Sequence, residues 1–172
     1  MPVRNFRKAS MKRSSFWGVR LFIPLLLAST AAFAQAERPF ALFIRTQEPT
    51  TKAGSEVNIW VTLENTSPHE IGILKSAPEL NYSVEMRDLS GKAVPDTEYG
   101  RKLKAAETVG ISTSSVIIPL KPNEIIEDQI TVSKLYEMAQ PGKYMVRVLR
   151  VIPPDLGTGA VSSNTITVVV TP

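Results

Sequence analysis

The chain contains no cysteine and only one histidine among its 172 residues. Without cysteine no disulfide can form, so an exported domain of this sequence must be stabilised by its hydrophobic core. The single histidine, His69, is too few for the usual zinc ligand sets and for a nucleophile–base pair. It directly follows Pro68, and we expect a solvated loop histidine there.

A long apolar run is absent as well. Only 14 residues separate Arg20 from Gln35, and Pro24 interrupts them, whereas a membrane-spanning helix needs about 20 consecutive apolar residues. A short apolar core that follows six basic residues and ends in small residues around Ala34 is typical of a secretory signal peptide.

We therefore predict a cleaved signal peptide over residues 1–36 and one mature domain over residues 37–172, with no transmembrane segment in the mature chain. This organisation predicts a periplasmic or secreted location in a bacterium. Met11 is an alternative start of translation, because the residues after it form a complete leader by themselves. Either start leaves the mature protein unchanged.

Acidic residues are absent from the first 36 positions, which changes the charge of the mature protein. The full chain has 20 Lys and Arg against 16 Asp and Glu, but six of the basic residues lie in the predicted leader. The mature domain keeps 14 basic and 16 acidic residues, a net charge of −2. Binding of nucleic acid requires a concentrated positive face, so we expect no nucleic-acid partner.

Apolar and polar residues alternate with a period of two over most of the mature chain. Val57, Ile59, Val61 and Leu63 show the pattern clearly, and it is typical of a strand with one face on a core. Similar segments predict further strands over residues 40–45, 70–75, 82–86, 92–94, 111–120, 125–132, 144–148 and 166–170. Turn signals separate them at the spacing of an antiparallel sandwich. We predict an all-β fold, a single antiparallel immunoglobulin-like β-sandwich of about eight or nine strands.

A helical pattern is visible only over residues 133–139. Ser133 is a suitable N-cap for it, and Pro141 with Gly142 would stop it. We expect one or two helical turns there, linking two strands across an end of the sandwich.

Residues 95–110 form an unusually long connection with weak strand signal. The segment contains Tyr99, Arg101, Lys102 and Lys104, and cations beside an aromatic residue are common in protein-binding surfaces. We predict a binding surface at these four residues. The alternative is a solvated lid or a short helical turn over an open end of the sandwich.

Two aromatic residues are expected to serve the scaffold. Trp60 would cover the second side of a central strand, and we expect it to be buried because large aromatic side chains usually dominate such cores. Tyr144 follows Pro141 and Gly142, where immunoglobulin-like domains place a corner tyrosine whose hydroxyl bonds nearby backbone.

Acidic residues with a superficial resemblance to catalytic or metal sites have simpler explanations. Asp155 lies between a proline pair and two glycines, which predicts an ordinary hairpin loop. Glu124, Glu127 and Asp128 lack the alternating oxygen ligands of a calcium loop. We expect these three residues on a solvated strand face.

Four segments together resemble bacterial exported immunoglobulin-like domains of uncharacterised function. Residues 120–124 (L-K-P-N-E), 141–148 (P-G-K-Y-M-V-R-V) and 163–168 (S-N-T-I-T-V) are similar to the second half of that pattern, and residues 52–67 are similar to its first half. The resemblance covers nearly the whole mature chain, and the matching residues are turn and core residues. It therefore implies the fold and leaves the function open.

A narrower resemblance is to the BsuPI-type proteinase inhibitor domain, through residues 63–67 and 82–88. It implies a protein that binds a proteinase through an exposed loop without doing chemistry. The sequence departs from that family at residues 94–96, where a tryptophan of the family pattern is missing.

The sequence shows no constellation of acid, base and nucleophile that would carry a reaction. We predict an exported non-catalytic binding or interaction module of the cell envelope that uses no cofactor and binds another exported or envelope protein. A BsuPI-type proteinase inhibitor is the alternative.

Overall fold

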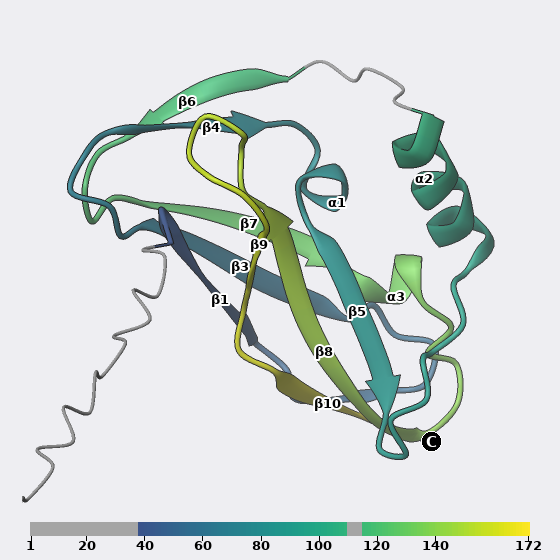
Figure 1. The fold of residues 1–172 in the computed structure, drawn as a ribbon. Helices are drawn as coiled ribbons and strands as arrows, with labels where there is room; N and C mark the ends of the chain where they lie inside the picture. Colours follow the sequence, from purple (N-terminus) through teal and green to yellow (C-terminus); the bar gives the residue numbers. More distant parts are fainter. Residues whose placement is uncertain (1–37, 110–114) are drawn as a thin grey trace, which may run out of the picture. The chain divides into compact units, whose positions relative to one another are not determined.

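A computed structural model of the chain describes residues 38–109 and 115–172 (Figure 1). The predicted signal peptide and residues 111–114 of the predicted strand 111–120 lie outside these residues. The strands are β1 (Phe40–Thr46), β2 (Thr50–Lys52), β3 (Asn58–Asn65), β4 (Ile71–Lys75), β5 (Ser83–Asp88), β6 (Val116–Leu120), β7 (Ile125–Thr131), β8 (Gly142–Val151), β9 (Ala160–Ser162) and β10 (Ile166–Thr171). The helices are α1 (Pro78–Asn81), α2 (Glu98–Val109) and α3 (Val132–Leu135).

Two sheets and a separate two-stranded ribbon make up the β-structure. One sheet has the strand order β1-β3-β7, and the other has the order β2-β10-β8-β5 with β9 also paired to β8. The ribbon consists of β4 and β6. All pairs are antiparallel except β2 with β10, which is parallel. The expectation of a purely antiparallel fold is thus wrong at one edge, where residues 47–49 carry the chain from the first sheet to the second.

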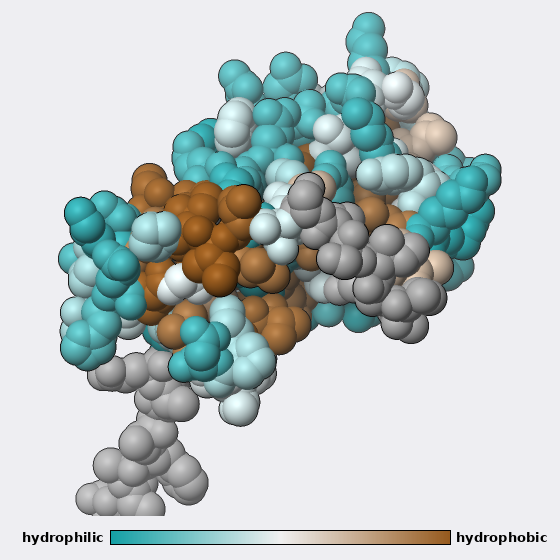
Figure 2. All heavy atoms as spheres, turned by 90° about the horizontal axis from the view of Figure 1, so that it is seen from above, coloured by the Kyte–Doolittle hydropathy of each residue, from teal (hydrophilic) through white to brown (hydrophobic). Residues whose placement is uncertain are grey.

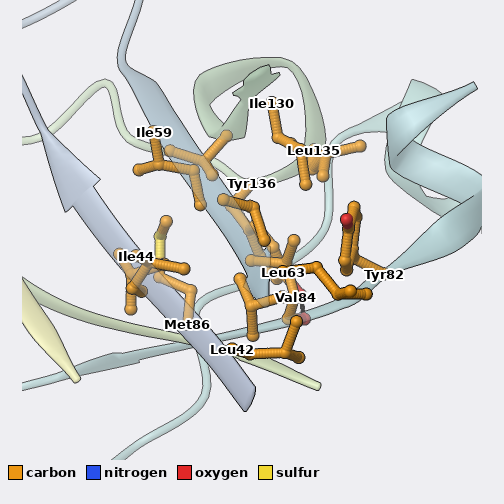
Figure 3. Packing of buried hydrophobic residues seen from close by; sticks show 14 of the residues in the cluster. Leu42, Ile44, Ile59, Leu63, Tyr82, Val84, Met86, Ile130, Leu135 and Tyr136 are labelled. Atoms are coloured by element: carbon orange, nitrogen blue, oxygen red, sulfur yellow. Dashed lines mark hydrogen bonds between the residues drawn. The ribbon is translucent and has the colours of Figure 1, made fainter. Parts of the chain in front are cut away.

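The core lies between the two sheets, and the period of two explains its composition. Burial alternates strictly along β3, so that Ile59, Val61 and Leu63 are fully buried. Figure 3 shows side chains of the first sheet, such as Ile59, gathered with Val84 and Met86 of the second. Full burial of each such side chain contributes roughly 1.5–3 kcal/mol. The predicted alternation and the mostly β fold are confirmed.

Trp60 lies outside this core, contrary to expectation. The alternation that turns Ile59 and Val61 inward turns Trp60 to the outer face of the sheet, where it is half-buried. The guanidinium carbon of Arg45, on the neighbouring strand, lies 5.3 Å from the centre of its ring. Trp60 is therefore covered by a cation rather than by a second layer of apolar side chains.

Tyr144 has the expected corner role. It is buried at the start of β8, and its hydroxyl donates a hydrogen bond of 2.8 Å to the Gln140 carbonyl. The turn before β8 is thereby fixed to the strand that follows it.

The long connection over residues 95–110 is mostly helix, and the expectation of a single helical piece over 133–139 is wrong. Strong helix formers over residues 101–106 favour α2, and the Thr97 hydroxyl accepts a hydrogen bond from the Gly100 amide, as an N-cap does. Only one turn, α3, forms near residue 133. Its Ser133 does not cap the helix but accepts a hydrogen bond from the Val57 amide.

Several short elements also differ from the sequence-based prediction. Helix α1 and strands β2 and β9, each of three or four residues, were not expected. The predicted strand 92–94 is reduced to a single bridge between Ala93 and Arg87. Elements of this length carry too few residues for a periodic pattern to be visible.

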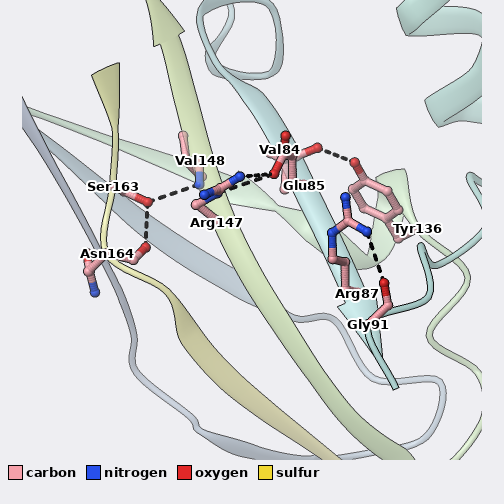
Figure 4. A network of polar contacts seen from close by, with 9 residues as sticks. All are labelled: Val84, Glu85, Arg87, Gly91, Tyr136, Arg147, Val148, Ser163 and Asn164. Atoms are coloured by element: carbon pink, nitrogen blue, oxygen red, sulfur yellow. Dashed lines mark hydrogen bonds and ion pairs between the residues drawn. The ribbon is translucent and has the colours of Figure 1, made fainter. Parts of the chain in front are cut away.

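Two side chains and one backbone amide bond the free edges of β1 and β5, one outer strand of each sheet. The Asn164 side chain bonds both the amide and the carbonyl of Ile44 in β1. The Tyr136 hydroxyl donates to the Val84 carbonyl in β5 (Figure 4), and the Val94 amide donates to Met86 of the same strand. Hydrogen bonds to these edge groups make it less favourable for a strand of another chain to pair there.

Asn65, at the end of β3, ties the ribbon to the first sheet. Its side chain is fully buried, and its amide group donates to the carbonyls of His69 and Leu120, each at 2.8 Å. Its side-chain oxygen accepts from the amide and hydroxyl of Ser67. The Asn-Thr-Ser turn of the sequence is therefore the point where β3 meets the beginning of β4 and the end of β6.

Replacement Asn65→Ala is expected to lower the free energy of unfolding by about 2–4 kcal/mol, because the fully buried side chain loses its hydrogen bonds to the carbonyls of His69 and Leu120 and leaves a cavity. Urea unfolding followed by tryptophan fluorescence measures the change. The control Thr66→Ala removes one exposed hydrogen bond to Arg38 and is expected to cost about 1 kcal/mol or less. Equal losses in both variants would contradict the role of Asn65.

Candidate binding surface

The ribbon of β4 and β6 has one buried and one exposed face. Ile71 pairs with Leu120 and Ile73 with Ile118, and Ile71, Ile73 and Leu120 are buried against the sandwich. On the other face Leu74 pairs with Ile117. These two side chains are 52% and 72% exposed, so the ribbon presents apolar side chains on both of its faces.

We call the exposed face the ribbon patch, which consists of Leu74, Ile117 and Pro119; Val116 is also exposed but lies on the other face, opposite Lys75. Figure 2 shows a continuous apolar area on this side of the molecule. The exposed surface of these side chains is on the order of 300 Å², a size at which apolar patches on single-chain proteins are often functional. The patch itself carries no charged residue.

A buried ionic cluster holds the ribbon in place. The Asp128 carboxylate of β7 accepts a hydrogen bond of 2.9 Å from the Tyr82 hydroxyl and lies 3.1 Å from the Lys75 ammonium of β4. Arg150 of β8 lies over the Tyr82 ring, 5.0 Å from its centre, and donates to the Leu74 carbonyl of β4. Both sheets are thus connected to the ribbon through four side chains.

The expected solvated face of Glu124, Glu127 and Asp128 is correct for two of its members. Glu124 and Glu127 are exposed, but the Asp128 side chain is only 5% exposed. Asp128 has the same strand parity as Ile126 and Ile130, both of which turn inward. The alternation of β7 was therefore the signal that would have predicted its burial.

Burial and, second, the charge of Asp128 raise the pKa of Tyr82 well above its ordinary value of 10.0. The unfolded chain loses this proton at lower pH than the folded chain does. The stability contributed by the neutral phenol is therefore fully present below about pH 10 and is lost as pH rises further.

Replacement Tyr82→Phe is expected to cost about 1–2 kcal/mol at neutral pH, because Asp128 loses a donor. The variant should also lose less stability than the native chain between neutral pH and about pH 11, since the group that titrates is gone. Urea unfolding at a series of pH values measures both effects. Burial also raises the pKa of Tyr136. The variant Tyr136→Phe therefore measures how much of the alkaline loss of stability belongs to this second buried tyrosine. Identical alkaline slopes for native chain and Tyr82→Phe would contradict the assignment.

Helix α2 carries the four residues predicted as a binding surface, and the structure gives them different surroundings. Tyr99 is 50% exposed. Lys102 forms an exposed ion pair with Glu98, and Arg101 donates to the Asp96 carbonyl. The Lys104 ammonium pairs with Asp96 at 2.6 Å and lies over the Tyr136 ring at 5.0 Å. All four residues are exposed, and each of the three cations has a local partner, so whether they form a binding surface stays a prediction.

Gly100 allows α2 to pack closely against α3. A Cβ atom at this position would overlap the Leu135 carbonyl oxygen, and the Thr97 amide donates to the same carbonyl. Absence of a side chain at Gly100 thus allows the first turn of α2 to contact the end of α3.

Replacement Gly100→Ala is expected to destabilise the fold by about 1–3 kcal/mol, since the clash outweighs the gain of about 1 kcal/mol in helix propensity. The exposed position Lys102→Ala, two residues along the same helix, is the control and should change stability by about 0.5 kcal/mol or less. Thermal or urea unfolding compares the two. A stabilised Gly100→Ala variant would show that α2 does not rest on Leu135.

The single histidine and the loop aspartate lie where the sequence predicts them. His69 is exposed, and its carbonyl accepts the bond from Asn65. Asp155 is exposed in the loop between β8 and β9.

Within residues 38–109 and 115–172 no group of three or more His, Asp or Glu side chains could hold a metal ion. In the same ranges, no helix has the length and apolar character needed to cross a membrane.

Known proteins give only loose similarities. No family model matches the sequence, and no curated protein matches it significantly. The CARDB domain of a Pyrococcus furiosus protein, in complex with di-metal ions, is 11% identical over 77% of this chain and 87% of that chain, with a TM-score of 0.37. The bacterial hydrophobin BslA is 13% identical over 77% of this chain and 95% of that chain, with a TM-score of 0.35.

The β-glucosidase EmGH1 from Erythrobacter marinus is 14% identical over 76% of this chain, with a TM-score of 0.38, and the match spans 15% of its length. Similarities of this degree carry no information about function. The assignment below therefore rests on the residues of the chain itself.

Proposed function

We propose that the chain is an exported, non-catalytic interaction module that binds protein through the ribbon patch. The observation that carries the proposal is the apolar face of Leu74 and Ile117, which stays exposed on a ribbon anchored by a buried ionic cluster. An exposed apolar face costs solubility, and a rigid anchor keeps that face from folding back onto the core.

The strand order supports a module of the immunoglobulin-like type. In chain order β1, β3 and β7 occupy the positions of strands A, B and E, and β5, β8 and β10 occupy those of C, F and G. The ribbon strand β4 and helix α2 are then additions between the strands of this framework. Domains of this kind commonly serve as binding modules, although fold alone does not assign the function.

The polar groups of the interior support a non-catalytic role. Asp128, Lys75 and Arg150 are each engaged with the ribbon or its neighbours, and Tyr82 is held in its neutral form. A catalytic acid or base needs a group within reach of a substrate, and Asp128 and Arg150 are buried beneath the ribbon. Export rests on the leader pattern of residues 1–36.

The α2 surface is a second candidate contact, and it would also serve the alternative of a proteinase inhibitor. An inhibitor presents an exposed segment to a proteinase, and Tyr99, Arg101 and Lys102 are all exposed on α2. We rank this surface below the ribbon patch, because each cation of α2 already has a partner nearby.

Site-specific photo-crosslinking in the native host tests the proposal. A photoreactive residue replaces Ile117 in one strain, and in the control strain it replaces Val151, which is 71% exposed in β8. A third strain carries it at Tyr99. We expect a discrete protein adduct from position 117 and none from position 151. An adduct from position 99 alone would move the contact to α2, and no adduct from 117 would refute the role of the ribbon patch.

A further inference from the structure

Strand β6 has a free edge, and its pairing with β4 shows which backbone amides and carbonyls point toward that edge. The Leu74 carbonyl accepts from Arg150 of β8 and therefore points away from β6. In an antiparallel ladder, the two residues of such a pair both turn their backbone groups outward. Ile117, which pairs with Leu74, thus directs its amide and its carbonyl to the free edge of β6.

Pro119 has the same parity as Ile117 along the strand, and it fits this assignment. Its pairing partner is Gly72, and a proline at that position removes no ladder bond because its nitrogen faces the free edge. The edge therefore offers an amide and a carbonyl at Ile117 and a carbonyl at Pro119. Within residues 38–109 and 115–172 no hydrogen bond to these groups is present.

This edge differs from the free edges of β1 and β5. Asn164 occupies the edge of β1 at Ile44, and Tyr136 occupies the edge of β5 at Val84. Comparable protection by a side chain of the described residues does not occur at Ile117. An unprotected edge beside an apolar face is the arrangement by which a strand of another chain adds to a sheet.

We infer that the partner at this edge is a second copy of the chain, with β6 of each copy paired antiparallel about a two-fold axis at Ile117. This inference rests on the proposed function, since it uses the ribbon patch. On the axis the amide of each Ile117 donates to the carbonyl of the other Ile117. The Pro119 carbonyl of each copy accepts from the Ser115 amide of the other copy. About four backbone hydrogen bonds result.

Charge favours this occupant. A two-fold axis places each residue opposite its own kind, so a charged patch would repel itself, whereas the row Leu74, Ile117, Ile117, Leu74 is neutral and apolar throughout. Pairing at the edge leaves the outer face of the patch exposed and buries mainly the backbone edge and the facing sides of the two Ile117 side chains, well under the roughly 800 Å² per side of a standard interface. The resulting dimer is weak and dependent on concentration. Because Pro119 lacks an amide proton, the ladder ends there and cannot lengthen.

Sedimentation velocity of the exported protein over a wide concentration range tests the dimer. The native chain should shift from monomer to dimer as concentration rises. Ile117→Lys and Ile117→Glu, each alone, should remain monomeric because like charges meet on the axis. An equal mixture of the two variants should regain the dimer. Val151→Lys is the control at an equally exposed position and should behave as the native chain does.

Thermal unfolding of each variant checks that the fold is intact. A native chain that stays monomeric at all concentrations, or Ile117 variants that dimerise as the native chain does, would overturn the two-fold pairing. If the chain is monomeric while a crosslink from position 117 captures a different protein, the pairing fails and the proposed function stands. If position 117 gives no crosslink at all, both fail.

Discussion

The buried carboxylate of Asp128 is the constraint on which the arrangement of the ribbon depends. A charge in the interior is costly unless it is paired and hydrogen-bonded, and Asp128 obtains its partners from Tyr82 and from Lys75 of β4. Arg150 adds a bond to β4 from the opposite sheet. Removing one partner would leave a buried charge uncompensated, so the cluster specifies where β4 lies more strictly than apolar packing alone would.

That position determines what the surface of the protein offers. The inner side chains of the ribbon complete the core, so Leu74 and Ile117 are forced outward by strand parity. Asn65 fixes one end of the ribbon to the first sheet, and the contacts of Lys75 with Asp128 and of Arg150 with Leu74 hold the other end. An apolar face held at both ends cannot turn inward to escape water, and burial in an interface remains the means of removing it from solvent.

Prediction from sequence succeeded where the physical cause is local. The alternation in β3 and β8, the corner tyrosine Tyr144 and the exposed turn at His69 follow from neighbouring residues. Helix α2 was missed because its apolar face is thin and Leu103 contacts the core only after α2 docks on α3. The ribbon patch was missed because alternation does not reveal which face of Leu74 and Ile117 another layer will cover.

The sequence by itself determined which residues share a face of each strand, because a period of two is a property of the extended backbone. It thereby determined that Asp128 shares a face of β7 with Ile126 and Ile130. The tertiary structure alone decided that Asp128 meets Lys75 and Tyr82, that Trp60 faces outward beneath Arg45, and that β6 keeps a free edge. These outcomes depend on strands far apart in the chain, and no local pattern encodes which of them become neighbours.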